Sequence, residues 1–323
     1  MKHPPYHLRP NKAVDRFMFI ESIRKLEKLH DLSEYTYYGL GGPYLEDFRL
    51  LYEFCPEINM VSIEKSQHTR ERQKFHLPCA TLSIKPGDFS SFLSNYQSAG
   101  KKSIFWMDYN EILNLSFFSE FTDLLCKVVE NSMIKVTLPY RPSDYIDQPG
   151  ESSKAEEFRT KFGALTTEEP TSNPEEFALI LQGMARKVAE EALPLGETPN
   201  EALVFQPISS FWYSDMECKD SPYMFTMTGI VCRGGRINEI KEIFKSSKFN
   251  VEWKKPTKID VPILSTKERL HLQKQLPCSG NAGEELLEAL GYNIDENKEK
   301  TKAKLEQYAT FHRHFPYFMK AVP

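Results

Sequence analysis

Long apolar runs are missing from this sequence. No stretch reaches the roughly 18 consecutive apolar residues of a membrane helix, and the first residues, Met1 to Tyr6, lack the apolar core of a signal peptide. The formal net charge is only -4, which excludes a global attraction to nucleic acid or to an anionic membrane. We therefore expect a cytoplasmic protein with no membrane partner, in which any polyanion would need a local basic patch.

Paired cysteines are also missing. The six cysteines are scattered singly, and none forms the Cys-x-x-Cys pattern of a zinc or redox site. His312 and His314 stand two positions apart, as two metal ligands on one strand would, but no Cys or third His lies close by in the sequence. The sequence therefore predicts no metal centre, and thiols that are reduced and mostly buried.

Large apolar side chains are abundant. Hydrophobic residues make up 40% of the chain, with 22 Phe and 15 Tyr, enough to offset the entropy cost of ordering a backbone. Apolar stripes at helical spacing alternate with short apolar runs, and this alternation predicts βαβ units around a parallel sheet. The expected strands contain Tyr35, Met60, Leu82, Ile104 and Met133. The expected helices cover 11–29 with Asn11 as N-cap, a segment from Pro43 to Phe54, 67–75 and 117–129.

The second half of the chain departs from this alternation. Residues 141–174 are rich in Ser, Thr and Glu and hold four prolines, which predicts an exposed insertion or lid. We expect that residues 148–170 can be deleted without loss of the fold. The apolar runs 203–213 and 223–232 are joined by too short a link for a parallel crossover, so they predict an antiparallel hairpin.

Polar or flexible residues directly follow four of the predicted strands. In an open α/β sheet, ligands bind outside the carboxyl ends of the strands. Glu64 follows Gly41 by roughly the 20 residues at which nucleoside sites place a carboxylate on the ribose hydroxyls. The four strand ends are Gly39-Leu-Gly41-Gly42, Glu64, Gly87-Asp88-Phe89 and Asp108-Tyr109-Asn110. The set predicts a nucleoside-type ligand with substrate chemistry beside Asp108.

Each of these features also has a purely structural interpretation. A glycine cluster between a strand and a helix is often only a tight turn, and a lone Glu64 is typical of a solvated strand end. Asp88 is a common turn former, and Asp108 suits the N-cap of the following helix. Their occurrence together at successive strand ends favours a ligand site.

Four motifs carry a resemblance to a known family. They are Leu8-Arg-Pro-Asn-Lys-Ala-Val-Asp-Arg16, Tyr38-Gly-Leu-Gly-Gly-Pro-Tyr-Leu-Glu-Asp-Phe48, Met60-Val-Ser-Ile-Glu64 and Trp106-Met-Asp-Tyr109. Over residues 8–232 the sequence resembles the class I S-adenosylmethionine-dependent methyltransferases, and more narrowly a group of bacterial O-methyltransferases.

The resemblance implies an α/β fold. Its core would be a Rossmann-like, doubly wound and mostly parallel seven-stranded sheet that includes an antiparallel hairpin strand. We expect a cofactor domain over residues 1–232, with the lid insertion at 141–174, and a C-terminal helical extension over residues 233–323 that packs on it.

The resemblance also implies S-adenosylmethionine as the cofactor and gives each strand end a role. Gly39, Gly41 and Gly42 would pack against its methionine part. Glu64 would hold the ribose, and Asp88 with Phe89 would flank the adenine. Asp108 would face the transferred methyl group, and Tyr109 would line the same pocket.

One position departs from the family pattern. Members usually carry an acidic residue at the start of the glycine motif, where this sequence has Tyr38. The methionyl amino group therefore needs another partner, and Asp47 or Asp15 is the expected substitute.

The leading hypothesis is methyl transfer to an oxygen or nitrogen nucleophile, with Asp108 orienting the nucleophile or accepting its proton. The alternative is a catalytically degenerate module that senses a nucleotide-like ligand or docks a protein, within a bacterial defence system as the narrower resemblance implies, and Tyr38 favours it. A nicotinamide dehydrogenase is third, because Tyr44 stands where G-x-G-x-x-G requires its last glycine.

The C-terminal extension mixes cations with aromatic rings, a pattern that suits a protein partner or a local anionic ligand. The residues concerned are Trp253, Lys254, Lys255, Lys258, Lys267, Arg269, His312, Arg313 and His314.

Overall fold

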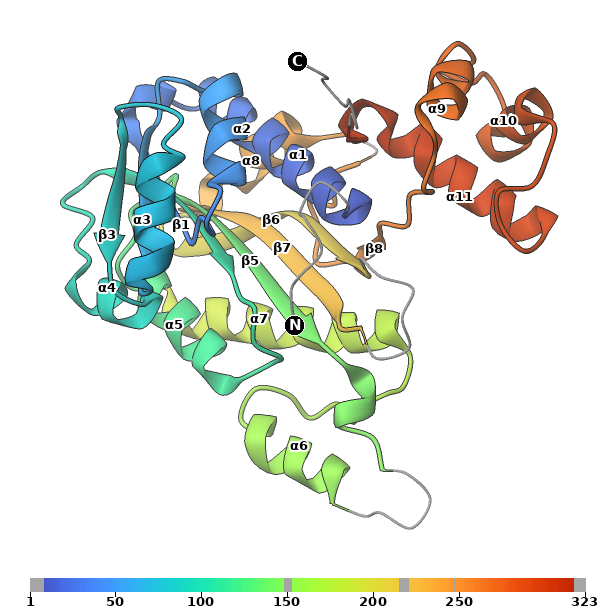
Figure 1. Cartoon of the computed structure of the whole chain (residues 1–323). Helices are drawn as coiled ribbons and strands as arrows, with labels where there is room; N and C mark the ends of the chain where they lie inside the picture. Colours follow the sequence, from blue (N-terminus) through green and yellow to red (C-terminus); the bar gives the residue numbers. More distant parts are fainter. Residues whose placement is uncertain (1–8, 148–152, 215–220, 247, 317–323) are drawn as a thin grey trace. The chain divides into compact units, whose positions relative to one another are not determined.

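The apolar runs of the sequence pair into one mixed sheet with the strand order β3-β2-β1-β4-β5-β7-β6-β8 (Figure 1). The computed structural model describes residues 9–147, 153–214, 221–246 and 248–316. The strands are β1 (Tyr35–Gly39), β2 (Asn59–Glu64), β3 (Leu82–Pro86), β4 (Lys102–Asp108), β5 (Met133–Tyr140), β6 (Leu203–Tyr213), β7 (Tyr223–Arg233) and β8 (Thr257–Lys258).

Helices connect most of these strands. In the first half of the chain they are α1 (Pro10–Lys25), α2 (Glu46–Phe54), α3 (Gln67–Phe75), α4 (Phe89–Asn95) and α5 (Leu115–Leu125). In the second half they are α6 (Lys154–Phe162), α7 (Pro174–Ala192), α8 (Ile237–Phe244), α9 (Thr266–Gln273), α10 (Ala282–Leu290) and α11 (Lys298–Phe311).

Strands β1 to β5 pair in parallel, whereas β7 runs antiparallel to β5. This arrangement confirms the predicted Rossmann-like sheet with its antiparallel hairpin and C-terminal helices. The sheet differs from the prediction in strand number, because the two-residue β8 brings it to eight strands in the described part of the chain.

The chain forms two compact units. One contains residues 19–212 and 222–257, and the other contains residues 1–18, 213–221 and 258–323. The domain boundary expected at residue 232 stays a prediction.

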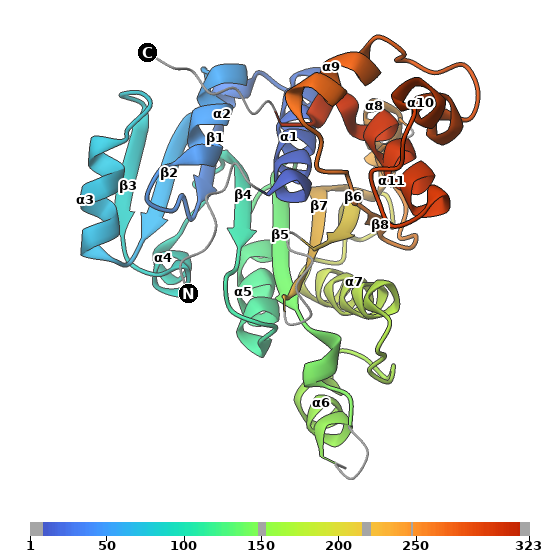
Figure 2. The same ribbon diagram turned by 45° about the vertical axis from the view of Figure 1, so that its right-hand side comes forward.

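The larger unit buries both faces of its sheet. All eight residues of β5 are buried, which requires cover on either side. Helices α4, α5 and α7 cover one face, and helices α2 and α8 cover the other (Figures 1 and 2). Apolar side chains of the two sets of helices belong to two separate core clusters. The sequence therefore needs near-continuous apolar runs in its central strands.

The segment between β5 and α7 is not the simple exposed insertion that was predicted. Its helix α6 places Phe158 and Phe162 in the hydrophobic core, at 1% and 0% exposure. Both rings pack against Tyr145, which stacks on Phe177 of α7 at 5.7 Å. We therefore revise the expectation that residues 148–170 can be deleted, since removing two buried phenylalanines would open a large void and destabilise the fold. Residues 148–152 lie outside the described residues, and the lid role stays a prediction.

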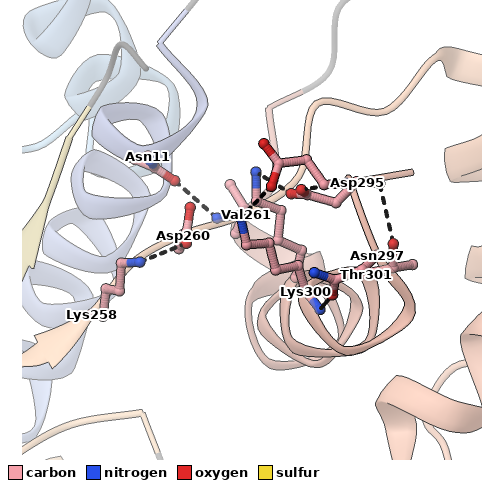
Figure 3. A network of polar contacts seen from close by, with 10 residues as sticks. Asn11, Lys258, Asp260, Val261, Asp295, Asn297, Lys300 and Thr301 are labelled. Atoms are coloured by element: carbon pink, nitrogen blue, oxygen red, sulfur yellow. Dashed lines mark hydrogen bonds and ion pairs between the residues drawn. The ribbon is translucent and has the colours of Figure 1, made fainter. Parts of the chain in front are cut away.

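The smaller unit contains the start of α1 and helices α9 to α11. Asn11 does not cap α1, which begins one residue earlier at Pro10. Instead its side-chain amide donates to the Ser214 carbonyl at 2.7 Å, and its side-chain oxygen accepts from the Val261 amide at 3.0 Å (Figure 3). This side chain joins three segments that are distant in the sequence.

No helix in the described ranges combines the length and the apolar character that a membrane span requires.

Buried tyrosines predict a loss of stability at alkaline pH. Burial raises the pKa of Tyr96 and of Tyr145 to about 12, and it also raises the pKa of Tyr35, Tyr109 and Tyr140. Below the unfolded-state pKa of about 10 every tyrosine is neutral in both states, so stability is full. Between about pH 10 and 12 only the unfolded chain ionises, and stability falls.

We expect the melting temperature to decrease steadily above about pH 10, and Tyr96→Phe to reduce that decrease. Thermal melts followed by circular dichroism, with tyrosinate absorbance recorded in parallel, check this. A melting temperature that stays constant to about pH 12 would contradict it.

Candidate active site

The carboxyl ends of β1 to β4 meet at one edge of the sheet, as the sequence predicts. Gly39 pairs with Ser62 of β2 on one side and with Trp106 of β4 on the other. Glu64 and Asp108 each lie two positions beyond these partners. Because side chains alternate along a strand, the two carboxylates stand at the same level and belong to the same face of the sheet.

The glycine loop after β1 folds tightly against its neighbours. A Cβ atom on Gly41 would lie 2.7 Å from Leu45 Cδ2 and from Ser62 Oγ, so no side chain fits there. Gly42 has a φ of 51°, in the region that glycine adopts readily. The loop also runs further than predicted, since α2 begins at Glu46 and Pro43 lies before it in a turn.

A buried network of hydrogen bonds connects this loop to α3 and β2. The Gln73 amide nitrogen donates to the Gly42 carbonyl at 2.9 Å, and the Ser62 hydroxyl donates to the Gln73 amide oxygen at 3.2 Å. Both Ser62 and Gln73 have 0% exposure. Sequence reasoning missed Gln73, because α3 is so polar that nothing marks one of its amides as buried.

We expect Gln73→Met to loosen the glycine loop. Methionine keeps the length of the side chain but leaves the Ser62 hydroxyl and the Gly42 carbonyl without these partners, at a cost of about 1 to 3 kcal/mol. The free energy of unfolding from urea titration measures this cost. The matched control is Gln67→Met on the exposed side of the same helix, and an equal effect of the two substitutions would show that the network has no role.

Glu64 is fixed at the end of β2 with one oxygen engaged. Its Oε1 accepts from the Ser66 amide at 2.7 Å, and Ser66 in turn caps α3 through the Thr69 amide at 3.3 Å. Within the described ranges, its Oε2 atom makes no hydrogen bond to the protein. The side chain is therefore oriented and still has an oxygen to offer a ligand.

Asp88 and Phe89 lie at the start of α4. Asp88 caps this helix by accepting from the Ser91 amide at 2.8 Å, and these hydrogen bonds hold the pKa of its carboxyl below the usual value. The Phe89 ring is buried at 6% exposure and meets Phe105 edge-on. Asp88 is therefore an N-cap residue and not the turn former that the structural interpretation suggested, and a role beside an adenine stays a prediction for both residues.

Asp108 ends β4 and does not cap α5, whose N-cap residue is Asn114. Tyr109 turns toward α5, where its ring packs on Phe117 at 4.2 Å and its hydroxyl donates to Glu120. Burial raises the pKa of both Tyr109 and Glu120. The Tyr109 side chain is therefore fixed against α5 by Glu120, a residue that sequence reasoning did not single out.

Lys135 is a buried cation that sequence reasoning also missed. It lies on β5 at 1% exposure, paired with Trp106 of β4. Its ammonium group is 5.2 Å from the Trp106 ring centroid and 5.3 Å from that of Phe19. It shares its sheet face with Asp108, because Trp106 lies two positions before Asp108. The sequence did contain a signal for Lys135, because a charged residue within an apolar strand is unusual and often has a specific role.

At the start of the glycine motif, where an acidic residue was expected, β1 carries two tyrosines that point to opposite faces of the sheet. Tyr38 stacks on Phe105 at 4.6 Å, on the face covered by α4 and α5. The side chain beside the glycine loop is that of Tyr37, whose hydroxyl oxygen would lie 2.8 Å from a Cβ on Gly39. An acidic side chain at position 38 would thus point away from the loop.

The two suggested substitutes lie in different units. Asp47 is in the first turn of α2, directly after the glycine loop. Asp15 is fully buried in α1 and accepts a hydrogen bond from the Tyr213 hydroxyl at 3.2 Å. The role of either as a partner of the amino group stays a prediction.

The cations of the C-terminal extension are partly neutralised. Lys255 forms an ion pair with Glu175 at 2.8 Å, and Lys258 forms one with Asp260 at 2.7 Å. Arg269 is buried at 7% exposure. An anionic ligand or protein partner at the extension stays a prediction.

His312 and His314 lie in a short 3₁₀ helix and not on the strand that their spacing suggested. Among the residues that the structure describes, no group of three His, Cys, Asp or Glu side chains is placed to hold a metal ion.

Three solved structures are similar to parts of this chain. Trm1 from Pyrococcus horikoshii with S-adenosyl-L-methionine is 13% identical, with a TM-score of 0.46, over 72% of this chain and 58% of that one. A probable spermidine synthase from Corynebacterium glutamicum is 11% identical, with a TM-score of 0.40, over 78% and 82%. A putative methyltransferase from Thermobifida fusca is 12% identical, with a TM-score of 0.39, over 70% and 84%. This chain thus spans less than two thirds of Trm1.

No curated protein matches the sequence. The family model described as "Putative O-methyltransferase" matches residues 4–323, nearly the whole chain, and the protein belongs to this family.

Proposed function

We propose that this protein transfers a methyl group from S-adenosylmethionine to an oxygen or nitrogen nucleophile, and that the carboxyl edge of β1 to β4 is its cofactor site. The observation that carries the proposal is that the glycine loop after β1 lies between two carboxylates, one on each flanking strand. Glu64 and Asp108 stand on either side of the glycine loop at the same level and on the same face.

The residues of this edge fit the nucleoside half of the cofactor. Glu64 keeps one carboxylate oxygen for the ribose hydroxyls while Ser66 orients the other. Gly41 and Gly42 let the loop turn tightly against Leu45 and Ser62, and in this proposal the backbone of that turn faces the cofactor. Asp88 and Phe89 stand at the adjoining strand end for the adenine.

The methionine half of the cofactor requires a carboxylate for its amino group. Tyr37 and Tyr38 supply none, so the proposal gives this role to Asp47, in the first turn of α2. The cofactor, when bound, supplies an electrophilic methyl group on a sulfonium.

Asp108 is the residue that acts on the nucleophile in this proposal. A carboxylate at the end of β4 is placed to accept a proton from a hydroxyl or an amine, or to orient its lone pair. Tyr109 is fixed by Glu120 against α5, and its role as a lining residue of the pocket stays a prediction. The protein's contribution is mainly to align and desolvate the reacting groups.

A second candidate is a ligand-sensing module without turnover. The aromatic side chains of Tyr37 and Tyr38 favour it, because neither supplies a carboxylate for the methionyl amino group. Incubation with methyl-labelled S-adenosylmethionine and pools of nucleic acid, protein and small molecules separates the two. Label transfer with release of the demethylated product supports the enzyme, whereas binding without any transfer supports the sensor.

A further inference from the structure

The surface of α3 concentrates positive charge. Only Glu71 is acidic between residues 65 and 77. The basic residues of this stretch are Lys65, Arg70, Arg72 and Lys74. Arg49 of α2 lies beside them, bonded to the His76 carbonyl at 3.0 Å. In a protein with a net charge of -4, this is the local basic patch that binding of a polyanion would need.

The three arginines of this surface are held by neutral oxygens. Arg49 donates to the Tyr44 carbonyl at 3.1 Å, and Arg70 donates to the Glu64 and Lys65 carbonyls at 3.0 and 2.6 Å. Arg72 donates to the Tyr44 hydroxyl at 2.7 Å. In the described ranges none of the three forms an ion pair, so their orientation is fixed while their charge is not neutralised.

Other arginines of the same unit behave differently. Arg159 pairs with Glu169 at 2.8 Å, Arg186 with Glu190 at 2.7 Å, and Arg236 with Glu239 at 2.8 Å. The α3 surface is therefore distinguished by unneutralised, pre-oriented charge and not by the number of its arginines.

Aromatic rings accompany these cations. Phe75 ends α3 with 86% of its surface exposed, and Tyr44 is 43% exposed. The His76 ring contacts both of them, at centroid distances of 5.2 and 5.3 Å. The Arg72 guanidinium lies 4.8 Å from the Tyr44 ring centroid. Exposed rings beside cations offer flat faces on which the bases of a nucleic acid can stack.

We propose that the α3 surface, composed of Tyr44, Arg49, Lys65, Arg70, Arg72, Lys74 and Phe75, binds single-stranded nucleic acid. Unpaired cations attract the phosphate backbone, and exposed rings stack with bases that are not already paired in a duplex. The carboxylates of an acidic protein could pair with these cations, but they would not stack on the ring of Phe75 as nucleic-acid bases do.

The surface leads to the candidate active site. Arg70 donates to the carbonyl of Glu64, the residue proposed to hold the cofactor ribose. Helix α3 begins at that same strand end and packs along β2 and β3 at the end of the sheet (Figures 1 and 2). A strand bound along α3 would thus reach the carboxyl edge, which deepens the proposed function by naming nucleic acid as the substrate class.

Fluorescence anisotropy with a labelled single strand of about 12 nucleotides, as DNA and as RNA, tests the proposal in the absence of cofactor. Phe75→Ala is expected to weaken binding by about 5- to 150-fold through the loss of stacking. Lys65→Gln with Lys74→Gln should weaken it and reduce the dependence of log affinity on log salt by about 1.4. Within the described ranges neither lysine makes a side-chain hydrogen bond or an ion pair, and the charge of Lys65 acts on Asp88 only through space. The double variant therefore removes charge without breaking a hydrogen bond.

Matched controls come from other exposed positions of the same unit. Leu195→Ala removes a side chain that is 90% exposed, and Lys245→Gln removes a lysine paired with Glu242. Neither should alter binding. Melting temperatures establish that every variant is folded.

Three results would overturn the proposal: no binding by the wild type at about 50 mM salt, unchanged binding by Phe75→Ala, or equal affinity for a duplex of the same sequence or for polyglutamate. The assay contains no S-adenosylmethionine, so the two proposals can fail separately. A protein that does not bind the cofactor can still bind nucleic acid, and a protein that does not bind nucleic acid can still bind the cofactor.

Discussion

Replacing Asp108 with asparagine is expected to lower the rate of methyl transfer by about 10²- to 10⁴-fold while leaving cofactor affinity nearly unchanged. The amide keeps the size of the side chain at the end of β4 but cannot accept the proton of the nucleophile. The effect should therefore appear in kcat and not in the dissociation constant of S-adenosylmethionine. Release of the demethylated product, measured with the acceptor pool that the wild type methylates, gives the rate.

The matched control is Asp123→Asn, the same substitution on an exposed position of α5. It should leave both quantities as in the wild type. If Asp108→Asn lowers cofactor affinity and rate equally, then Asp108 has a structural role, and the assignment of the nucleophile-binding side to β4 is wrong.

Glu64→Gln is expected to weaken S-adenosylmethionine binding by about 1.5 to 3 kcal/mol, or roughly 10- to 150-fold. A carboxylate accepting from two ribose hydroxyls forms charge-assisted hydrogen bonds, which an amide replaces only in part. The amide oxygen can still accept from the Ser66 amide, so the start of α3 should be preserved. Isothermal titration of the wild type and the variant gives the difference directly.

Glu53→Gln on the exposed side of α2 serves as the control, since it changes the net charge equally. An affinity of Glu64→Gln equal to that of the wild type would remove Glu64 from the site. Equal weakening by both substitutions would indicate a long-range effect of charge and not a contact.

Much of the fold follows from periodicity. The apolar run around Ile104 predicts a buried central strand, and Lys102–Asp108 forms one. The stretch from Gln67 to Phe75 predicts a helix with the bounds that α3 has. The segment after β5 was interpreted wrongly because prolines and charges outnumber its apolar residues. Phe158 and Phe162 are only two side chains, yet tertiary packing on α7 makes them core residues.

The candidate site was predictable to the extent that it lies at strand ends. Gly41, Glu64 and Asp108 follow apolar runs, so topology alone brings them to one edge. Gln73 and Glu120 were not predictable. Each lies on a helix, and the sequence does not show which side of that helix faces the candidate site. The face of Tyr38 was also not predicted, and on a strand the neighbouring residue Tyr37 points to the opposite face, beside the glycine loop.

The central claim is that the carboxyl edge of β1 to β4 binds S-adenosylmethionine, and isothermal titration of the full chain tests it most directly. Separate titrations with S-adenosylmethionine, with its demethylated product and with NAD distinguish a methyltransferase site from a general nucleotide site. The account predicts saturable binding of the first two ligands with one site per chain, and no binding of NAD. No heat of binding with S-adenosylmethionine at about 1 mM ligand, or preferential binding of NAD, would contradict it.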